Sequence, residues 1–218
     1  MIALLRYHAA VLVRSHRWVF PVVIYAFLLL SVGASSAEPL RDGLDWSAAM
    51  LVPVVALLTR SMLTAEPGAA RACVAAAAGP GRAQLATLLT ALGGGVVLAL
   101  AGAGYEVLSD KSVPLGAMPA TLGAGLGTAV VCLLVGSGVG ALCNPPLVRH
   151  PAVALVGTMA AVVFALVADV SPASAALRGN GAAQVSAAWP SGVPLLAAAG
   201  LVAFSWTASA LAAARRGG

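Results

Sequence analysis

The sequence predicts an all-α integral membrane protein with six transmembrane helices and both termini on the inner side of the membrane. Three observations predict this class. Of the 218 residues, 61% are hydrophobic and 9% are charged, whereas about 25% are charged in an average soluble domain. Six stretches are apolar enough to cross a bilayer, and arginine is shared unequally among the segments that join them. With so few charges, a soluble fold could not cover its surface, so that class is excluded.

The six spans follow from the length of each apolar stretch. A helix needs about 20 mainly apolar residues to cross the hydrocarbon core. Trp18, Trp46 and Trp189 mark span ends, because indole rings favour the headgroup layer, and Pro151 and Pro194 suit the first turn of a helix. The spans belong to a single transmembrane domain, residues 1–218, and cover residues 18–35, 45–64, 85–105, 117–142, 151–170 and 193–213.

Basic residues set the predicted orientation. The acidic residues fall mostly on the outer side, and Glu66 alone is inside. Ser35-Ser36-Ala37 resembles a signal-peptide cleavage site, but the start before it is long, so residues 18–35 are predicted as a retained span. The basic bias predicts a multi-pass protein of the cell membrane. The inner segments carry Arg6, Arg14, Arg17, Arg60, Arg71, Arg82, Arg149, Arg215 and Arg216, and the outer segments carry only Arg41, Lys111 and Arg178.

Residues 1–17 are amphipathic at helical spacing. The pattern predicts an interfacial helix at the inner leaflet, with its arginines toward anionic lipid headgroups. The alternative is a plain basic start that enforces the orientation. Leu4, Leu5, Val11 and Leu12 share one arc, and Arg6, Arg14 and Arg17 share the opposite one.

The inner segment between the second and third spans contains a short helix-forming run. Glu66-Pro67 supplies a start and Gly79-Pro80-Gly81 a stop. The dozen residues between them span about 18 Å as a helix, too short to cross a bilayer. We therefore expect a rigid surface helix over 67–78, flanked by Arg71 and Arg82, that either docks a cytoplasmic partner or is a plain connection.

Two further segments have alternative interpretations. Residues 171–192 form the longest outer loop, and Arg178 is their only charge. This apolar loop either re-enters the membrane as a lid or lies on the surface. Arg60 is the one charge well inside an apolar run, about one turn from the inner end. It either snorkels to the cytosol, forms part of an inner gate or contacts the short surface helix.

Glycine and proline predict how two spans pack. Gly123-x-x-x-Gly127 and Gly136-x-x-x-Gly140 permit close helix approach on different faces of the fourth span. That span is therefore expected near the centre of the bundle. Pro53 in the second span removes a backbone hydrogen bond and predicts a kink.

Several chemistries are excluded by missing patterns. Lys111, the only lysine, follows no glycine run, so the chain has no phosphate-binding P-loop. The three cysteines (Cys73, Cys132, Cys143) form no CxxC pair, and no metal or cofactor site is expected on this chain. The sequence lacks catalytic motifs, and its dispersed arginines do not predict nucleic-acid binding. The histidines, His8, His16 and His150, are interpreted as interfacial groups.

The order of these elements resembles the permease subunits of type-2 ABC transporters, the exporter class. Those permeases have an elbow helix before the first span, matching Ile2–Arg17, and a coupling helix between the second and third spans, matching Pro67–Ala78. Their outer segment between the fifth and sixth spans re-enters the membrane and would map to Ser171–Ser191. The start, Leu4-Leu5-Arg6-Tyr7-His8, looks like that of actinobacterial permeases of this kind.

The resemblance implies an ATP-driven exporter subunit that is not itself an enzyme. ATP and Mg²⁺ would bind to a separate cytosolic ATPase subunit, and a second permease chain, identical or homologous, would complete the pathway. The apolar spans favour an amphiphilic substrate such as a lipid, a peptide or a natural-product drug. A secondary transporter or channel not driven by ATP is the alternative, as is an intramembrane enzyme or a non-transporting anchor. The residues expected to couple to the ATPase are Glu66, Pro67, Arg71, Cys73, Gly79 and Arg82.

Overall fold

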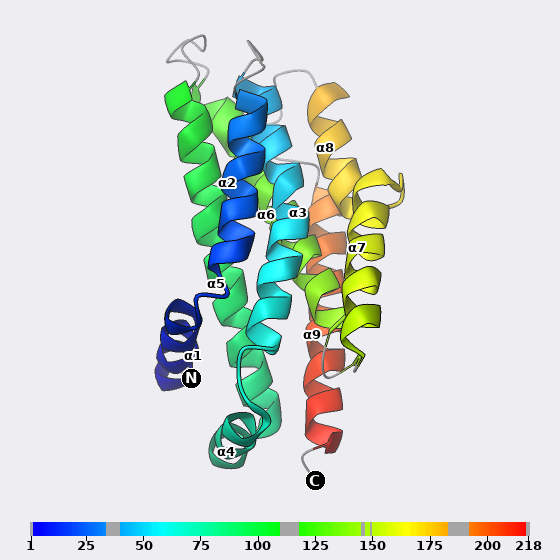
Figure 1. Cartoon of the computed structure of the whole chain (residues 1–218). Coiled ribbons are helices and arrows are strands. Elements are labelled where there is room, and N and C mark those ends of the chain that lie inside the picture. Colours follow the sequence, from blue (N-terminus) through cyan, green and yellow to red (C-terminus); the bar gives the residue numbers. More distant parts are fainter. Residues whose placement is uncertain are drawn as a thin grey trace.

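The computed structural model describes residues 2–33, 40–109, 118–144, 147–148, 150–182 and 192–216. These residues form nine α-helices and no strand, and the long helices run side by side as a bundle (Figure 1). The helices are α1 (Ile2–Ser15), α2 (Val19–Gly33), α3 (Leu40–Leu63), α4 (Gly68–Ala78), α5 (Pro80–Ser109), α6 (Met118–Leu142), α7 (Pro151–Val167), α8 (Pro172–Ala182) and α9 (Gly192–Arg216).

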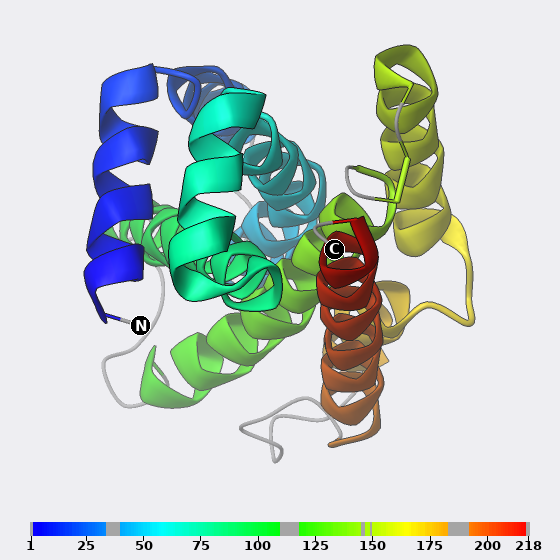
Figure 2. The same ribbon diagram turned by 90° about the horizontal axis from the view of Figure 1, so that it is seen from below.

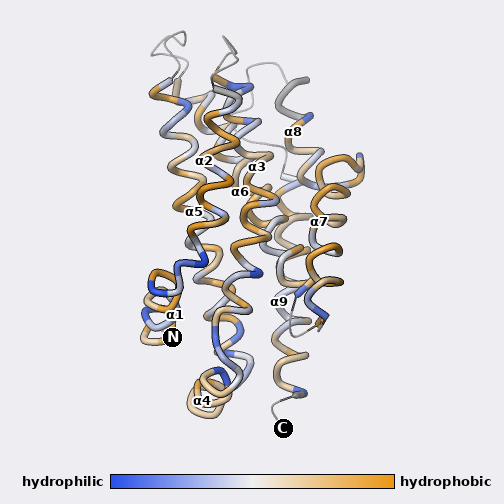
Figure 3. Tube along the Cα trace, viewed as in Figure 1, coloured by the Kyte–Doolittle hydropathy of each residue, from blue (hydrophilic) through white to orange (hydrophobic). Residues whose placement is uncertain are grey.

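Length and composition allow five of the helical stretches to cross a membrane, or six if the bent pair α1–α2 counts as one span. Apolar residues predominate along these stretches (Figure 3). The predicted class, an all-α protein with several helices long and apolar enough to cross a membrane, is thus confirmed. The orientation, and the choice of the cell membrane, stay predictions.

Helix α5 is longer than the sequence indicates. It runs from Pro80 to Ser109, against the predicted 85–105, because only Gly79 separates it from α4. Gly79 has a φ of 86°, in the left-handed region that glycine adopts without strain. Its N–H donates to the Ala75 carbonyl at 2.8 Å and so completes the end of α4. The two helices therefore meet without a flexible linker.

A sharp turn separates α1 from α2. The axes of the two helices differ by 71°. His16 takes a φ of 53°, and its carbonyl accepts from the Val19 N–H at 3.1 Å. The Trp18 indole donates back to the Val13 carbonyl at 3.3 Å. The turn is therefore held by local hydrogen bonds and allows α1 to leave the direction of the bundle (Figure 1).

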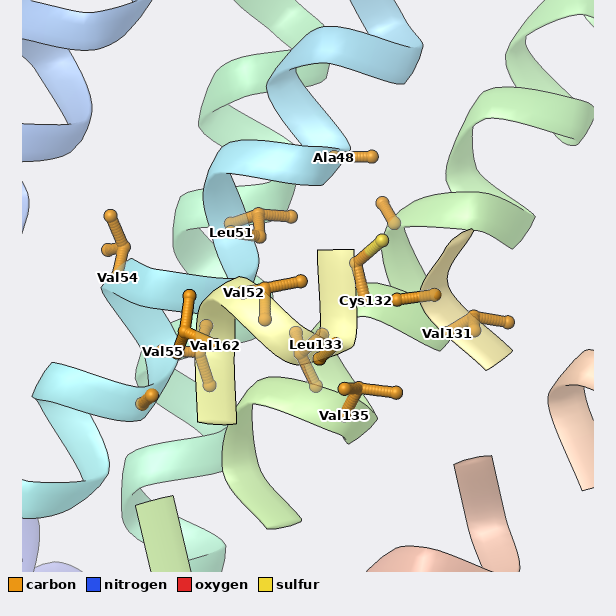
Figure 4. Packing of buried hydrophobic residues seen from close by; sticks show 14 of the residues in the cluster. Ala48, Leu51, Val52, Val54, Val55, Val131, Cys132, Leu133, Val135 and Val162 are labelled. Carbon is orange, nitrogen blue, oxygen red and sulfur yellow. The ribbon is translucent and has the colours of Figure 1, made fainter. Parts of the chain in front are cut away.

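The centre of the bundle is the contact between α3 and α6. A Cβ atom on Gly136 would lie 2.7 Å from the Val52 carbonyl oxygen, and one on Gly140 would lie 2.7 Å from Cβ of Thr59. Glycine at these positions lets the two backbones approach closely. Around this contact, Ala48, Leu51, Val52, Val54 and Val55 of α3 pack with Val131, Cys132, Leu133 and Val135 of α6 and Val162 of α7 (Figure 4).

Helix α6 also packs on its other side. Gly138 faces Leu201 and Ser205 of α9, and α6 contacts α5, α7 and α8 as well. In the apolar stretch of α6, 72% of residues are buried, the largest share among the candidate spans. Helix α6 thus takes the predicted central position, although its contact with α9 is made at Gly138, which lies outside the two predicted glycine pairs.

The segment predicted as an outer loop, 171–192, begins with a helix. Helix α8 packs against α6, α9 and α7, and its Ala173 and Ala176 belong to the buried core. The alternative of a plain surface loop is therefore wrong for residues 172–182. Ala173 and Ala176, which lie three positions apart on one face of α8, let the helix pack against the bundle. The choice of a re-entrant path stays a prediction, and residues 183–191 lie outside the described part of the chain.

Candidate functional site

One end of the bundle carries α1, α4 and the C-terminal end of α9; we call it the α4 end (Figure 1). Most of the described arginines belong to the helix segments at this end, whereas α3 begins with Arg41, and α8 carries Arg178, at the other end. Seen from the α4 end, α7 lies on the far side of the bundle from α1 and α4 (Figure 2). The arginines of the α4 end are Arg6, Arg14, Arg17, Arg60, Arg71, Arg82, Arg215 and Arg216.

The exposed surface of helix α4 carries almost no large side chains, and we call it the bare face of α4. It packs on α5, yet none of its residues is fully buried. Apart from Arg71, its exposed side chains are small and uncharged. A helix face open to water normally carries polar and charged residues, so this composition suits a face that another protein covers. The exposed residues are Gly68, Ala69, Arg71, Ala72, Cys73, Ala76 and Ala77.

The connection from α3 to α4, residues 64–67, is tied to its surroundings by side chains. Arg17, in the turn between α1 and α2, donates to the Thr64 carbonyl at 2.8 Å. Arg71 turns back from α4 and donates to the carbonyls of Leu63 and Glu66. The connection is therefore bonded both to the helix that follows it and to the turn before α2.

A buried polar cluster joins the same connection to α1 and α5. Nδ1 of His8 lies 3.3 Å from Oε1 of Glu66, and the side chains are 2% and 8% exposed. Nε2 of His8 lies 3.5 Å from Oγ1 of Thr87. Burial lowers the pKa of His8, and the charge of Glu66 opposes this shift. Burial, followed by the Glu66 charge, raises the pKa of Tyr7, whose ring lies edge-on to the imidazole. We call His8, Glu66 and Thr87 the histidine cluster.

A second polar cluster, at the C-terminal end of α3, is built around Arg60. Its guanidinium donates to Oδ1 of Asn144 at 3.2 Å and to the Pro151 carbonyl at 3.1 Å. The Asn144 amide donates to the Gly140 carbonyl at 2.8 Å and to Thr158 Oγ1 at 3.3 Å. Arg60 therefore bridges α3 to the start of α7 through the chain after α6. We call Arg60, Asn144 and Thr158 the arginine cluster.

The predicted coupling residues lie in two groups. Glu66, Pro67 and Arg71 come together at the start of α4, and Gly79 and Arg82 lie at its far end. Cys73 is exposed between them. Only Glu66 turns inward, toward His8. The coupling role of all six stays a prediction, as does a gating role for Arg60.

Sequence reasoning missed three buried polar residues. His8 was interpreted as an interfacial group, although it falls in helical register with Leu4 and Leu12 on the inward arc of α1. Thr87 and Asn144 were not singled out, because hydrogen bonds between helices leave no periodic pattern. Of these three residues, only His8 carried a signal that could have revealed it.

Comparison with known proteins adds no relative. The chain matches no protein-family model, no curated protein and no solved structure. Among the described residues, no three His, Cys, Asp or Glu side chains gather closely enough to hold a metal ion.

Proposed function

We propose that this chain is the membrane-spanning subunit of an ATP-driven exporter, and that a separate cytosolic ATPase subunit binds to α4. The observation that carries the proposal is the bare face of α4 at the arginine-rich end of the bundle. A face of alanines admits the close approach of a partner, and Arg71 supplies one charge beside it. In this proposal the α4 end faces the cytosol, in keeping with the positive-inside rule.

The connections of α4 supply a route for movement. At one end, the single residue Gly79 joins α4 to α5, whose 30 residues extend for about 45 Å. At the other end, hydrogen bonds from Arg17 and Arg71 tie the connection to its neighbours. A displacement of α4 by the ATPase would therefore reach α2, α3 and α5 without a flexible linker.

The chemistry is divided between subunits. ATP and Mg²⁺ bind to the ATPase, and this chain supplies no catalytic residue. A second permease chain, identical or homologous, completes the pathway. The apolar groove along α7, about 770 Å³, suits an amphiphilic substrate such as a lipid, a peptide or a natural-product drug. The lining residues include Leu155, Val156, Met159, Val163, Phe164 and Val167.

Binding to a defined ATPase tests the proposal. The chain is expressed together with any P-loop ATPase that a reading frame beside its gene encodes, and is purified through its own tag. We expect the ATPase to co-elute and its turnover to respond to the chain. The substitutions Ala72→Asp and Ala76→Asp place a charge on the bare face and should weaken binding at least tenfold, since an unpaired charge buried at an interface costs several kcal/mol.

The matched control is Ala214→Asp, an equal change at an exposed position near the end of α9. It should leave binding unchanged. Equal binding by the Ala76→Asp and Ala214→Asp variants would refute α4 as the docking site. Absence of any complex, together with substrate movement driven by an ion gradient alone, would favour the secondary transporter.

A further inference from the structure

The histidine cluster is a buried junction of three elements. His8 comes from α1, Glu66 from the connection before α4, and Thr87 from α5. Glu66 Oε1 is buried and accepts no hydrogen bond, and its contact with His8 Nδ1 at 3.3 Å is electrostatic. A buried ionisable pair is costly unless it is satisfied. The arrangement therefore depends on which protons the three side chains hold.

The hydrogen atoms available for donation limit the hydrogen-bonding states of the histidine cluster. The Thr87 hydroxyl has one hydrogen, and two acceptors lie near it: the Ala83 carbonyl at 3.1 Å and His8 Nε2 at 3.5 Å. A neutral imidazole that carries its hydrogen on Nδ1, the nitrogen nearer Glu66, leaves Nε2 as an acceptor. The Thr87 hydroxyl can then satisfy Nε2 only by turning away from Ala83. A charged imidazole donates from both nitrogens, and Thr87 keeps Ala83. The distances permit both states. Protonation of His8 therefore decides whether the Thr87 hydroxyl donates to His8 or to the Ala83 carbonyl.

The surroundings favour the neutral state. Burial lowers the pKa of His8 more than the Glu66 charge raises it. Three other ionisable groups lie at the junction. Tyr7 of α1 lies beside the carboxylate, Arg71 of α4 lies at the Glu66 carbonyl, and Arg17 lies at the Thr64 carbonyl. The side chain that α5 contributes, Thr87, carries no charge. Because the docked imidazole has a lower pKa than an exposed one, docking is most stable above about pH 6.5 and weakens as the pH falls.

We propose that His8, Glu66 and Thr87 form a proton-sensitive latch, which fastens α1 to the connection before α4 and loosens when His8 is protonated. The latch is a property of this chain alone. One consequence rests on the proposed function: acid pH would free α4, the proposed docking site of the ATPase, from α1.

Distance measurements on the whole chain in lipid nanodiscs, without any ATPase, test the latch. One spin label is placed on Cys73, exposed on α4, and a second on Val13→Cys, an exposed position of α1. Cys132→Ala and Cys143→Ser remove the other thiols. At pH 8 we expect one narrow distance distribution. At pH 5 a second, longer population should dominate, with a midpoint below about 6.5, the ordinary pKa of histidine.

Variants assign the transition to one residue. The chain has three histidines, so the double variant His16→Gln and His150→Gln leaves His8 as the only one and should keep the transition. His8→Gln should abolish it. Glu66→Gln removes the attraction for the charged imidazole and should move the midpoint to lower pH.

Each outcome decides the proposal. A distance that is the same at pH 8 and pH 5, a transition that survives His8→Gln, or one that vanishes in the double variant would overturn it. If His8→Gln does not fold, the unsubstituted chain and the double variant still decide. Failure of the latch would leave α4 as the docking site untouched, since the ATPase binding test is separate.

Discussion

The α3–α6 pair and helix α7 are both apolar, but they pack in opposite ways. In the apolar stretches of α3 and α6, 61% and 72% of residues are buried, against 22% in the stretch Pro151–Arg178 that contains α7. The first two helices meet through glycine, whereas α7 directs valine, leucine and phenylalanine away from the bundle. Hydropathy alone does not separate these cases, because lipid and protein interior are equally apolar. What separates them is the size of the side chains at the contact.

Adding one methyl group should have the largest effect on this comparison. At Gly136 a new Cβ would lie 2.7 Å from the Val52 carbonyl oxygen, which cannot move without shifting α3. We expect Gly136→Ala to lower the free energy of unfolding by about 3 kcal/mol, the upper part of the range for overpacking. Thermal unfolding in nanodiscs measures it.

The matched control is the same change on α7. A Cβ on Gly157 would meet nothing within 4 Å, so Gly157→Ala should be neutral or stabilise by up to about 1 kcal/mol through helix propensity. Equal losses at the two sites would show that close α3–α6 packing does not govern stability.

Truncating a leucine to alanine should give the next largest difference in stability between the α3–α6 contact and α7. Leu51 is 1% exposed in the core, and Leu155 on α7 is 43% exposed. Leu51→Ala should lower the free energy of unfolding by about 2 kcal/mol, because it leaves a cavity in the core that lipid cannot fill. Leu155→Ala should change stability by less than about 0.5 kcal/mol. Reversible unfolding in mixed micelles compares the two. A larger loss at Leu155 would mean that a protein surface covers α7.

Helices that are marked by hydropathy and by proline or glycine could be predicted from the sequence. Contacts between residues far apart in the chain could not. The five long apolar helices, or six with the bent pair α1–α2, follow from apolar length, and the short helix α4 follows from Pro67 and Gly79. Helix α8 was missed because its sequence contains Pro172 and the run Gly179-Asn180-Gly181, which are typical of loops. The partner of Glu66 was missed because His8 lies 58 positions away, and no local pattern joins them.

The smallest effect should come from the arginine cluster, which holds α7 where hydrophobic packing is sparse. Arg60→Ala removes the donors to Asn144 and Pro151. Half-burial lets water replace part of each bond, so the loss should be about 1 kcal/mol. Arg82→Ala, at an exposed position of α5, should cost nothing measurable.

A second readout separates a bridge from a general loss of charge. Because Arg60 joins α3 to α7, its removal should raise amide hydrogen exchange at the start of α7 and leave exchange in the middle of α6 unchanged. Arg60→Lys keeps the charge but cannot reach both acceptors in the same fork geometry, so it should behave like Arg60→Ala at α7. If Arg60→Lys restored full protection there, charge alone would hold α7, and the directed hydrogen bonds would not matter.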